Sequence, residues 1–239
     1  MKNRKLLICF IMLFFIPLFV KSQGGNVGIG YNVGYHLSNK GMNFVLDRYN
    51  ETRSYLSAKM GKPNVYRGFT FYSDIYFRQT MVDFDVTINR SYCFAEGVDN
   101  TKSLVHRDIK FKVTSWAIGY AKKITNKNQK TLGVYMGSDC NMAFLSTFTR
   151  KYTVGQDMPE YEKVIWDVNL GITPYLQWVG NRFSTKAYIR LLILKNDYWD
   201  LNYKLNQNTF YKDDIEDEQG GLISAGFALR YNFFKNKKQ

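Results

Sequence analysis

The chain has 239 residues, of which 45% are hydrophobic, 17% aromatic and 22% charged. Its 18 tyrosines, 18 phenylalanines and 4 tryptophans exclude a disordered chain, and its 3 cysteines are too few for a disulfide scaffold. The mean hydropathy of −0.33 argues against a polytopic helical membrane protein, which needs repeated apolar spans of about 20 residues. The length suits one large domain or two small ones.

The N-terminus has the parts of an export signal. A basic start is followed by an apolar run over residues 6–20 and by the small residue Ser22, before a cleavage point ahead of Gln23. We therefore predict a signal peptide over residues 1–22, with an uncleaved anchor as the alternative. Its removal takes away four bases and no acids, which leaves 29 bases and 20 acids, a net charge of +9. In an exported protein this charge favours an anionic membrane surface as a partner, and no nucleic acid is expected.

The residues after the signal alternate between apolar and polar side chains, which is typical of β-strands. In the last segment, for example, Phe227 and Leu229 share one face while Arg230 lies on the other. Eight such segments of 12 to 17 residues lie at about 25–37, 66–77, 81–95, 108–121, 131–144, 163–179, 182–195 and 219–234. They exceed the usual length of soluble strands, and about 9–11 tilted residues suffice to cross a membrane.

The connections between these segments alternate in length. Short ones lie near 78–80, 122–130 and 180–181, and long ones near 38–65, 96–107, 145–162 and 196–218. Tight periplasmic turns and long external loops are typical of outer-membrane barrels, whose closed sheet leaves no strand edge in lipid. We therefore predict an all-β fold, an eight-stranded antiparallel transmembrane β-barrel in the bacterial outer membrane, formed by residues 23–239.

Alternation alone does not tell which side faces the lumen, because a soluble barrel would hold its apolar side chains inside. Charges in mid-strand, aromatic residues near strand ends and the export signal favour apolar side chains that face lipid. The predicted lipid-facing residues are Val164, Trp166, Val168, Leu170, Ile172, Ile223, Phe227, Leu229, Tyr231 and Phe233.

The opposite faces carry five acids and five bases. The predicted lumen charge network consists of Asp74, Asp83, Asp85, Asp139, Asp167, Lys110, Lys112, Lys186, Arg190 and Arg230. An eight-stranded barrel is only just wide enough for its own side chains, so charges inside it must pair. This predicts a closed lumen, and a narrow ion path is the alternative.

The segment 108–121 changes face midway, because Ile109 and Phe111 lie on one face and Trp116 on the other. We expect either a bulge near residues 114–115, which would keep both sets toward lipid, or an inward-pointing Trp116. In the neighbouring segments the two mature cysteines, Cys93 and Cys140, fall on opposite faces of non-adjacent strands, which predicts no disulfide.

One short amphipathic helix is predicted over residues 42–60, in the first long loop. Val45, Leu46 and Tyr49 recur at helical spacing, and Gly61 supplies a stop signal. The helix would cap the mouth of the barrel. The alternative is that it lies on the outer membrane surface or docks a partner.

No catalytic, cofactor-binding or metal site is predicted. His36 and Ser38 would share a strand face, but no third orienting group is evident for hydrolysis. Asp83 and Asp85 would also share a face, where lumenal ion pairing is favoured over cation binding. The acidic run at 213–218 lacks the order of an EF-hand.

This plan resembles the small outer-membrane barrel proteins, such as the transmembrane domain of the OmpA class and the PorT-like barrels. The resemblance covers nearly the whole mature chain and is carried by the signal peptide, the eight segments and the aromatic last strand at 227–234. It implies the lipid bilayer and the barrel-insertion machinery, which reads such a strand, as partners. The residues from Lys235 to Gln239 depart from the pattern.

Members of this family serve as anchors, adhesins, channels and lipid-modifying enzymes, so the fold does not decide the function. We predict a non-enzymatic integral outer-membrane protein without a cofactor, whose external loops contact a surface protein or lipopolysaccharide. A small passive channel or a conduit for hydrophobic solutes is the alternative, and a surface lipid hydrolase is a third hypothesis.

Overall fold

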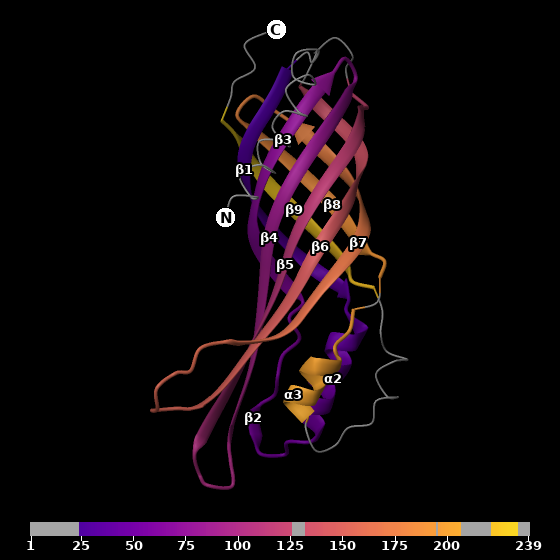
Figure 1. Ribbon diagram of the computed structural model, residues 1–239. Coiled ribbons are helices and arrows are strands. Elements are labelled where there is room, and N and C mark those ends of the chain that lie inside the picture. Colours follow the sequence, from indigo (N-terminus) through magenta and orange to yellow (C-terminus); the bar gives the residue numbers. More distant parts are fainter. Residues whose placement is uncertain (1–23, 126–131, 195, 207–220, 234–239) are drawn as a thin grey trace, which may run out of the picture.

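The computed structural model describes residues 24–125, 132–194, 196–206 and 221–233. The predicted signal peptide, the acidic run at 213–218 and the residues after Phe233 lie outside the described residues. Figure 1 shows the arrangement of the elements. In chain order they are β1 (Gly24–Ser38), α2 (Lys40–Glu51), β2 (Leu56–Ala58), β3 (Val65–Phe77), β4 (Thr80–Val98), β5 (Leu104–Lys123), β6 (Gly133–Thr153), β7 (Glu162–Val179), β8 (Phe183–Leu192), α3 (Trp199–Asn206) and β9 (Ile223–Asn232).

Eight of the strands close into a ring. Their order is β4-β3-β1-β9-β8-β7-β6-β5, and a further pairing between β4 and β5 joins the two ends. All of these pairings are antiparallel. The closed ring leaves no exposed edge, which is the requirement for a sheet that meets lipid. The prediction of an eight-stranded antiparallel barrel is confirmed, and each predicted segment is a strand.

The wall of the barrel is much taller on one side. β4 to β7 have 18 to 21 residues, whereas β1, β3, β8 and β9 have 10 to 15. β3 pairs with β4 only as far as Arg90, and β8 pairs with β7 only as far as Gly171. Beyond these residues the four tall strands continue as an open sheet, at the end of the ring where α2 and α3 lie (Figure 1).

We call this part the helical lobe. It consists of α2, β2, α3 and the strand ends at 91–98, 104–113, 145–153 and 162–170. The short β2 pairs with Glu96 and Gly97, and so covers part of the edge of β4 that β3 leaves open. Much of the predicted loops at 96–107 and 145–162 is therefore strand, because β4, β5 and β6 run further than the alternation indicated.

The predicted helix ends early. α2 stops at Glu51 and not at residue 60, and the chain then turns back through β2. The Asn50 side chain accepts a hydrogen bond from the Met60 backbone N–H at 2.7 Å and donates one to the Met60 carbonyl at 3.0 Å. These two bonds return Met60 to the buried face that its helical spacing suggested. The second helix, α3, was not predicted.

Two apolar clusters are buried. The larger one, which we call the lobe core, joins α2 and α3 to the inner side of the tall strands, and it includes Met42, Val45, Leu46, Cys93, Ile109, Phe111, Val113, Leu145, Ile165, Leu201 and Leu205. The smaller one fills the opposite part of the barrel with Tyr76, Met81, Ala121, Tyr135, Tyr175, Val179 and Tyr188. Neither helix of the described residues has the length and hydropathy that a membrane crossing requires.

Candidate functional site

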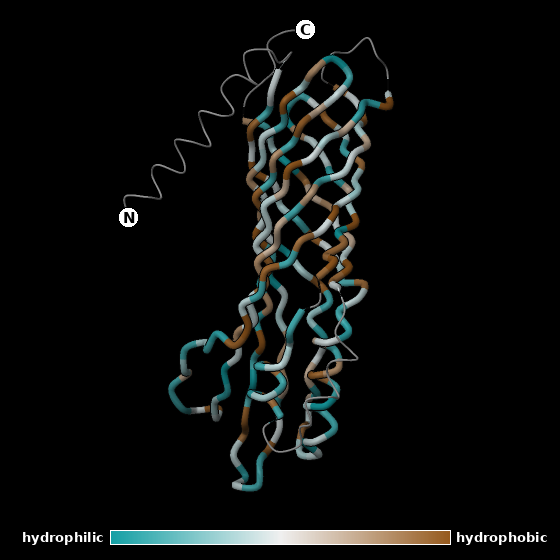
Figure 2. The backbone as a smooth tube through the Cα atoms, turned by 45° about the vertical axis from the view of Figure 1, so that its right-hand side comes forward, coloured by the Kyte–Doolittle hydropathy of each residue, from teal (hydrophilic) through white to brown (hydrophobic). Residues whose placement is uncertain are grey.

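The outer side of the barrel is apolar. Figure 2 shows hydrophobic and hydrophilic residues alternating along the strands, and the burial pattern places the hydrophobic ones outward. Seven of the predicted outward residues have exposed side chains, from 42% for Tyr231 to 61% for Trp166; the others are Leu170, Ile172, Phe227, Leu229 and Phe233. Val168 and Ile223 are half-buried on the same side. An apolar exterior around a polar interior is the arrangement of a transmembrane barrel and the reverse of a soluble one.

Val164 does not face outward as predicted. It packs against the lobe core, because the pairing of β6 with β7 shifts register between Thr147 and Phe148. This irregularity places both Val164 and Ile165 at the lobe core, so the alternation of β7 does not extend to its first residues.

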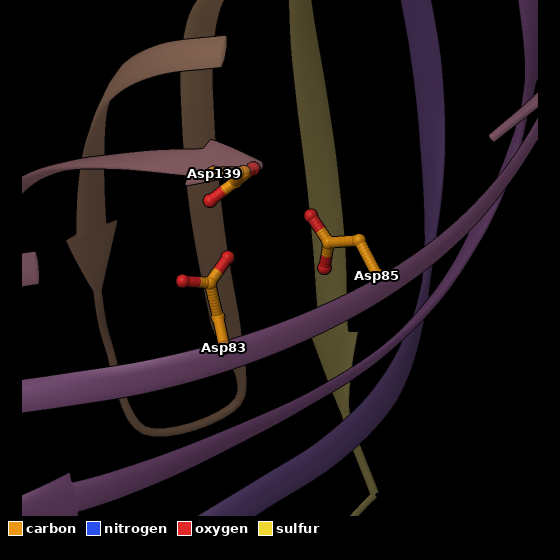
Figure 3. A group of neighbouring side chains, drawn as sticks. All are labelled: Asp83, Asp85 and Asp139. Carbon is orange, nitrogen blue, oxygen red and sulfur yellow. The ribbon is translucent and has the colours of Figure 1, made fainter. Parts of the chain in front are cut away.

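The lumen holds a compact charge cluster. Asp83 and Asp85 of β4 and Asp139 of β6 point toward one another (Figure 3). One carboxylate oxygen from each of the three lies within 4.8 Å of the other two. Such a group offers the ligands of a metal site. Here the three carboxylates surround the ammonium of Lys186, at 2.7, 2.8 and 2.8 Å from its Nζ atom. The lysine thus supplies the positive charge at the place where a cation would bind.

Arg230 extends the cluster across the lumen. Its Nη2 lies 2.5 Å from Asp85 and its Nη1 lies 3.7 Å from Asp74. Gln177 links the same groups, since it accepts a hydrogen bond from Arg230 at 3.2 Å and donates one to Asp74 at 2.8 Å. Tyr175 donates to Asp83, and its ring lies 3.8 Å from the Lys186 ammonium. The structure therefore brings six of the ten predicted residues together: Asp74, Asp83, Asp85, Asp139, Lys186 and Arg230.

A glycine makes room for this cluster. A Cβ atom at Gly119 would clash with carboxylate oxygens of both Asp139 and Asp83. β5 lies between β4 and β6, so the two carboxylates reach each other across the bare backbone of Gly119. Sequence reasoning missed this residue, although a glycine in the middle of a strand often marks a close approach.

Four predicted members of the network lie elsewhere. Arg190 is buried in the lumen, where its guanidinium lies 5.5 Å from the Tyr188 ring and makes no ion pair with a described acid. Asp167 lies in the helical lobe, where it accepts a hydrogen bond from the Val168 N–H. The predicted position of Lys110 and Lys112 is wrong, because both side chains face outward and not into the lumen.

The reason lies in β5, which is paired without a bulge along its whole length with β4. Ile109 and Phe111 are buried in the lobe core, and Trp116 points outward with 43% of its surface exposed. Both expectations for this strand, the bulge and an inward Trp116, are therefore wrong. Instead the polarity of the two faces inverts along the strand: the inner face changes from polar in the ring to apolar in the lobe.

The inner side of the helical lobe is held by a mixture of apolar and polar contacts. Arg53, just after α2, donates to the Leu205 carbonyl at 2.5 Å and to Asn206 at 3.3 Å, and its guanidinium lies 4.0 Å from the Tyr49 ring. These bonds tie the end of α2 to the end of α3. Burial raises the pKa of the Tyr49 hydroxyl and lowers the pKa of the nearby Arg107 guanidinium.

The residues considered for hydrolysis do not form a pair. The pairing of β1 with β9 shifts register between His36 and Ser38, so that they do not simply share a strand face. His36 is buried beside the rings of Tyr66 and Phe111, and neither ring nitrogen has a hydrogen-bond partner among the described residues. The prediction of no disulfide is confirmed, since Cys93 is buried and Cys140 exposed, and both are free.

Comparison with known proteins adds little to this geometry. No protein-family model matches the chain, and no curated protein matches it. Among solved structures, it is similar to the attachment invasion locus protein Ail of Yersinia pestis. The complex of Ail with the heparin analogue sucrose octasulfate has a TM-score of 0.45 and 13% identity, with 87% of this chain and 97% of that chain covered.

Two further Ail structures are similar. One has a TM-score of 0.45 and 14% identity over the same shares of the chains; the other, in a phospholipid bilayer nanodisc, has a TM-score of 0.29 and 12% identity over 86% of this chain and 99% of that chain. The closed ring of eight antiparallel strands, its apolar exterior and its charged interior are by themselves the fold of a small β-barrel of the bacterial outer membrane.

Proposed function

We propose that this chain is a non-enzymatic integral outer-membrane protein whose lumen is closed by the charge cluster and whose helical lobe stands outside the cell. The observation that carries the proposal is the position of Lys186, which is buried in the middle of the bore with three carboxylates around it. The lobe, not the bore, is then the part that meets other molecules.

The space around the cluster supports a closed lumen. The cavity beside Lys186, Arg190 and Arg230 has a volume of about 10 Å³, which is at the lower limit for a single water molecule. An ion that crossed the bore would have to separate the ion pairs of Lys186 and Arg230 with the carboxylates, which lie in the lumen without bulk water around them. Separating such a buried pair costs several kcal/mol.

The unequal connections support the outward position of the lobe. The turns at 78–79 and 180–182 are short, and the lobe lies on the opposite connections, which are external in outer-membrane barrels. The outer face of its sheet exposes aromatic residues, with 50% of Tyr92 and 54% of Phe94 accessible. A surface protein or lipopolysaccharide would meet these residues.

At the other end of the chain, the outward Phe227, Leu229, Tyr231 and Phe233 fit the last strand that the insertion machinery reads.

Conductance tests the closed lumen. The purified protein is first shown to be folded by its faster gel mobility before boiling, and it is then added to planar bilayers. We expect no steady single-channel currents. Steady currents that disappear in Arg190→Gln or Asp139→Asn variants would instead establish the passive channel.

The absence of enzymatic activity has a separate test. We expect the lipid profile of cells that produce the His36→Ala variant to match that of cells that produce the native chain, since His36 contacts two rings and has no hydrogen-bond partner in the described part of the chain. A changed acyl composition in the variant would support the surface hydrolase.

A further inference from the structure

An apolar groove runs along the outer face of the barrel. Its volume is about 620 Å³, and its lining from β1, β3 and β4 includes Tyr31, Arg67, Phe69, Phe71, Ile88 and Arg90. Its floor belongs to the lipid-facing surface, with Phe69 and Phe71 more than half exposed. A groove of this kind, on a surface that meets acyl chains, has the shape and the chemistry to hold one of them.

Three bases lie in register at the lobe end of this groove. Arg67 of β3 is directly opposite Arg90 of β4, and Arg90 is directly opposite Lys112 of β5. All three point outward. Like charges directly opposite each other destabilise a sheet. None of the three makes an ion pair with a described acid, so nothing in the described part of the chain offsets this repulsion.

The position of this row relative to the groove specifies an anion with an apolar tail. The row of bases is two residues beyond the row of Tyr31, Phe69 and Ile88, a distance of about 7 Å along the strands. Arg67 and Arg90 form the last pair of β3 with β4, where the ring gives way to the open sheet of the lobe. Lipid requires a closed sheet, so we place the boundary between lipid tails and headgroups at this level. Guanidinium groups bind phosphate with two parallel hydrogen bonds, which favours a phosphate between the two arginines.

We propose that Arg67 and Arg90, with Lys112 beside them, bind the phosphate of a phosphorylated, acylated glycolipid of the outer leaflet, one of whose acyl chains lies in the groove. The inference rests on the proposed function, because it requires the barrel to span the outer membrane with its lobe outside. It goes further in naming the lipid class and the residues that recognise it.

The binding test compares a variant that loses two bases at the lobe end of the barrel with a control that loses one base at the opposite end. The Arg67→Gln/Arg90→Gln double variant is matched by Lys122→Gln, an outward base near the opposite end of β5. The probes are lipid A with its phosphates, the same lipid after dephosphorylation, and inorganic phosphate, each titrated into the protein in neutral detergent. We expect each arginine to contribute roughly fivefold to lipid A affinity, so the double variant binds roughly 25-fold more weakly. Lys122→Gln should bind as the native chain does.

A second measurement separates lost recognition from lost folding. In neutral detergent the double variant should unfold at the same temperature as the native chain or higher, because a repulsion has been removed. In lipid A the order should reverse. The proposal is overturned if the double variant keeps native affinity, if dephosphorylated lipid A binds as tightly as lipid A, or if inorganic phosphate binds as tightly as the lipid. A native chain whose gel mobility does not change on boiling would instead refute the closed barrel, and with it the proposed function.

Discussion

The barrel and the helical lobe are built largely from the same four strands, yet they turn opposite faces to their surroundings. In the barrel, Ile118 of β5 points outward and is 54% exposed; nine residues earlier on the same strand, Ile109 is fully buried under the helices. Barrel strands place apolar groups outside because lipid surrounds them, whereas the lobe end of β5 turns Ile109, Phe111 and Val113 inward, under the helices and away from water. The solvent therefore decides the sense of the alternation, and one strand that crosses from lipid to water must invert it.

Replacing Lys186 with methionine should break the barrel most severely. The change leaves Asp83, Asp85 and Asp139 without their shared base, and removing one partner of a buried pair costs about 3–5 kcal/mol. We expect the loss in the free energy of unfolding, measured with urea and read by gel mobility. Lys122→Met, which removes an outward base, is the control. Equal stability of the two variants would mean that the cluster does not hold the barrel together.

A matched pair of substitutions on β5 sharpens the comparison between the two regions. Ile109→Ala opens a cavity in the lobe core and should cost about 3 kcal/mol, whereas Ile118→Ala shortens a side chain that is 54% exposed on the outer face and should cost well under about 1 kcal/mol. Hydrogen exchange should show α2 and α3 opening in Ile109→Ala while the barrel strands stay protected. The reverse order of the two effects would show that the lobe end of β5 lies in lipid.

Arg53→Ala should loosen the lobe alone. The variant loses the hydrogen bonds to Leu205 and Asn206 and the contact with the Tyr49 ring, for a cost of about 1–2 kcal/mol. We expect faster hydrogen exchange in α3 without a change in the gel mobility of the folded barrel. Arg53→Lys, which keeps the charge but not the paired donors, should recover only part of the protection; full recovery would argue against the hydrogen bonds.

The smallest effect is expected at the tip of the β4–β5 hairpin. The Asp99 carboxylate accepts hydrogen bonds from the Thr101 hydroxyl and from the N–H groups of Thr101 and Ser103, which lower its pKa. A lowered pKa means that the turn is stabilised above the ordinary pKa of an aspartate and loses this contribution as the pH falls through the folded value. An NMR titration should show a higher Asp99 pKa in Thr101→Val. An unchanged value would show that the hydroxyl is not the cause.

The strands were predictable because alternation persists wherever one face meets a different solvent from the other. The same rule explains the errors. The alternation predicts Lys110 and Lys112 in the lumen if polar residues face inward along the whole segment, whereas the lobe end of the strand turns its polar residues outward. No property of these residues alone marks where a strand leaves the membrane.

The cluster in the lumen could be predicted only in part. Asp83, Asp85 and Lys186 lie on polar strand faces, which the sequence shows directly, but which of them meet depends on the stagger of strands around the ring. The close approach through Gly119 is likewise a property of neighbouring strands and not of one segment. The short α3 was missed because Leu201 and Leu205 give only one helical repeat.

Lys186 also bears on how the chain is assembled. Its partners Asp83 and Asp85 come 103 and 101 residues earlier in the sequence, and Arg230 reaches back 145 residues to Asp85. Until the last hairpin has taken its place, these ions would face acyl chains or a half-formed wall without their counterions. An incompletely inserted molecule therefore has a higher free energy. The closed barrel is the first state in which each of these charges has its partner.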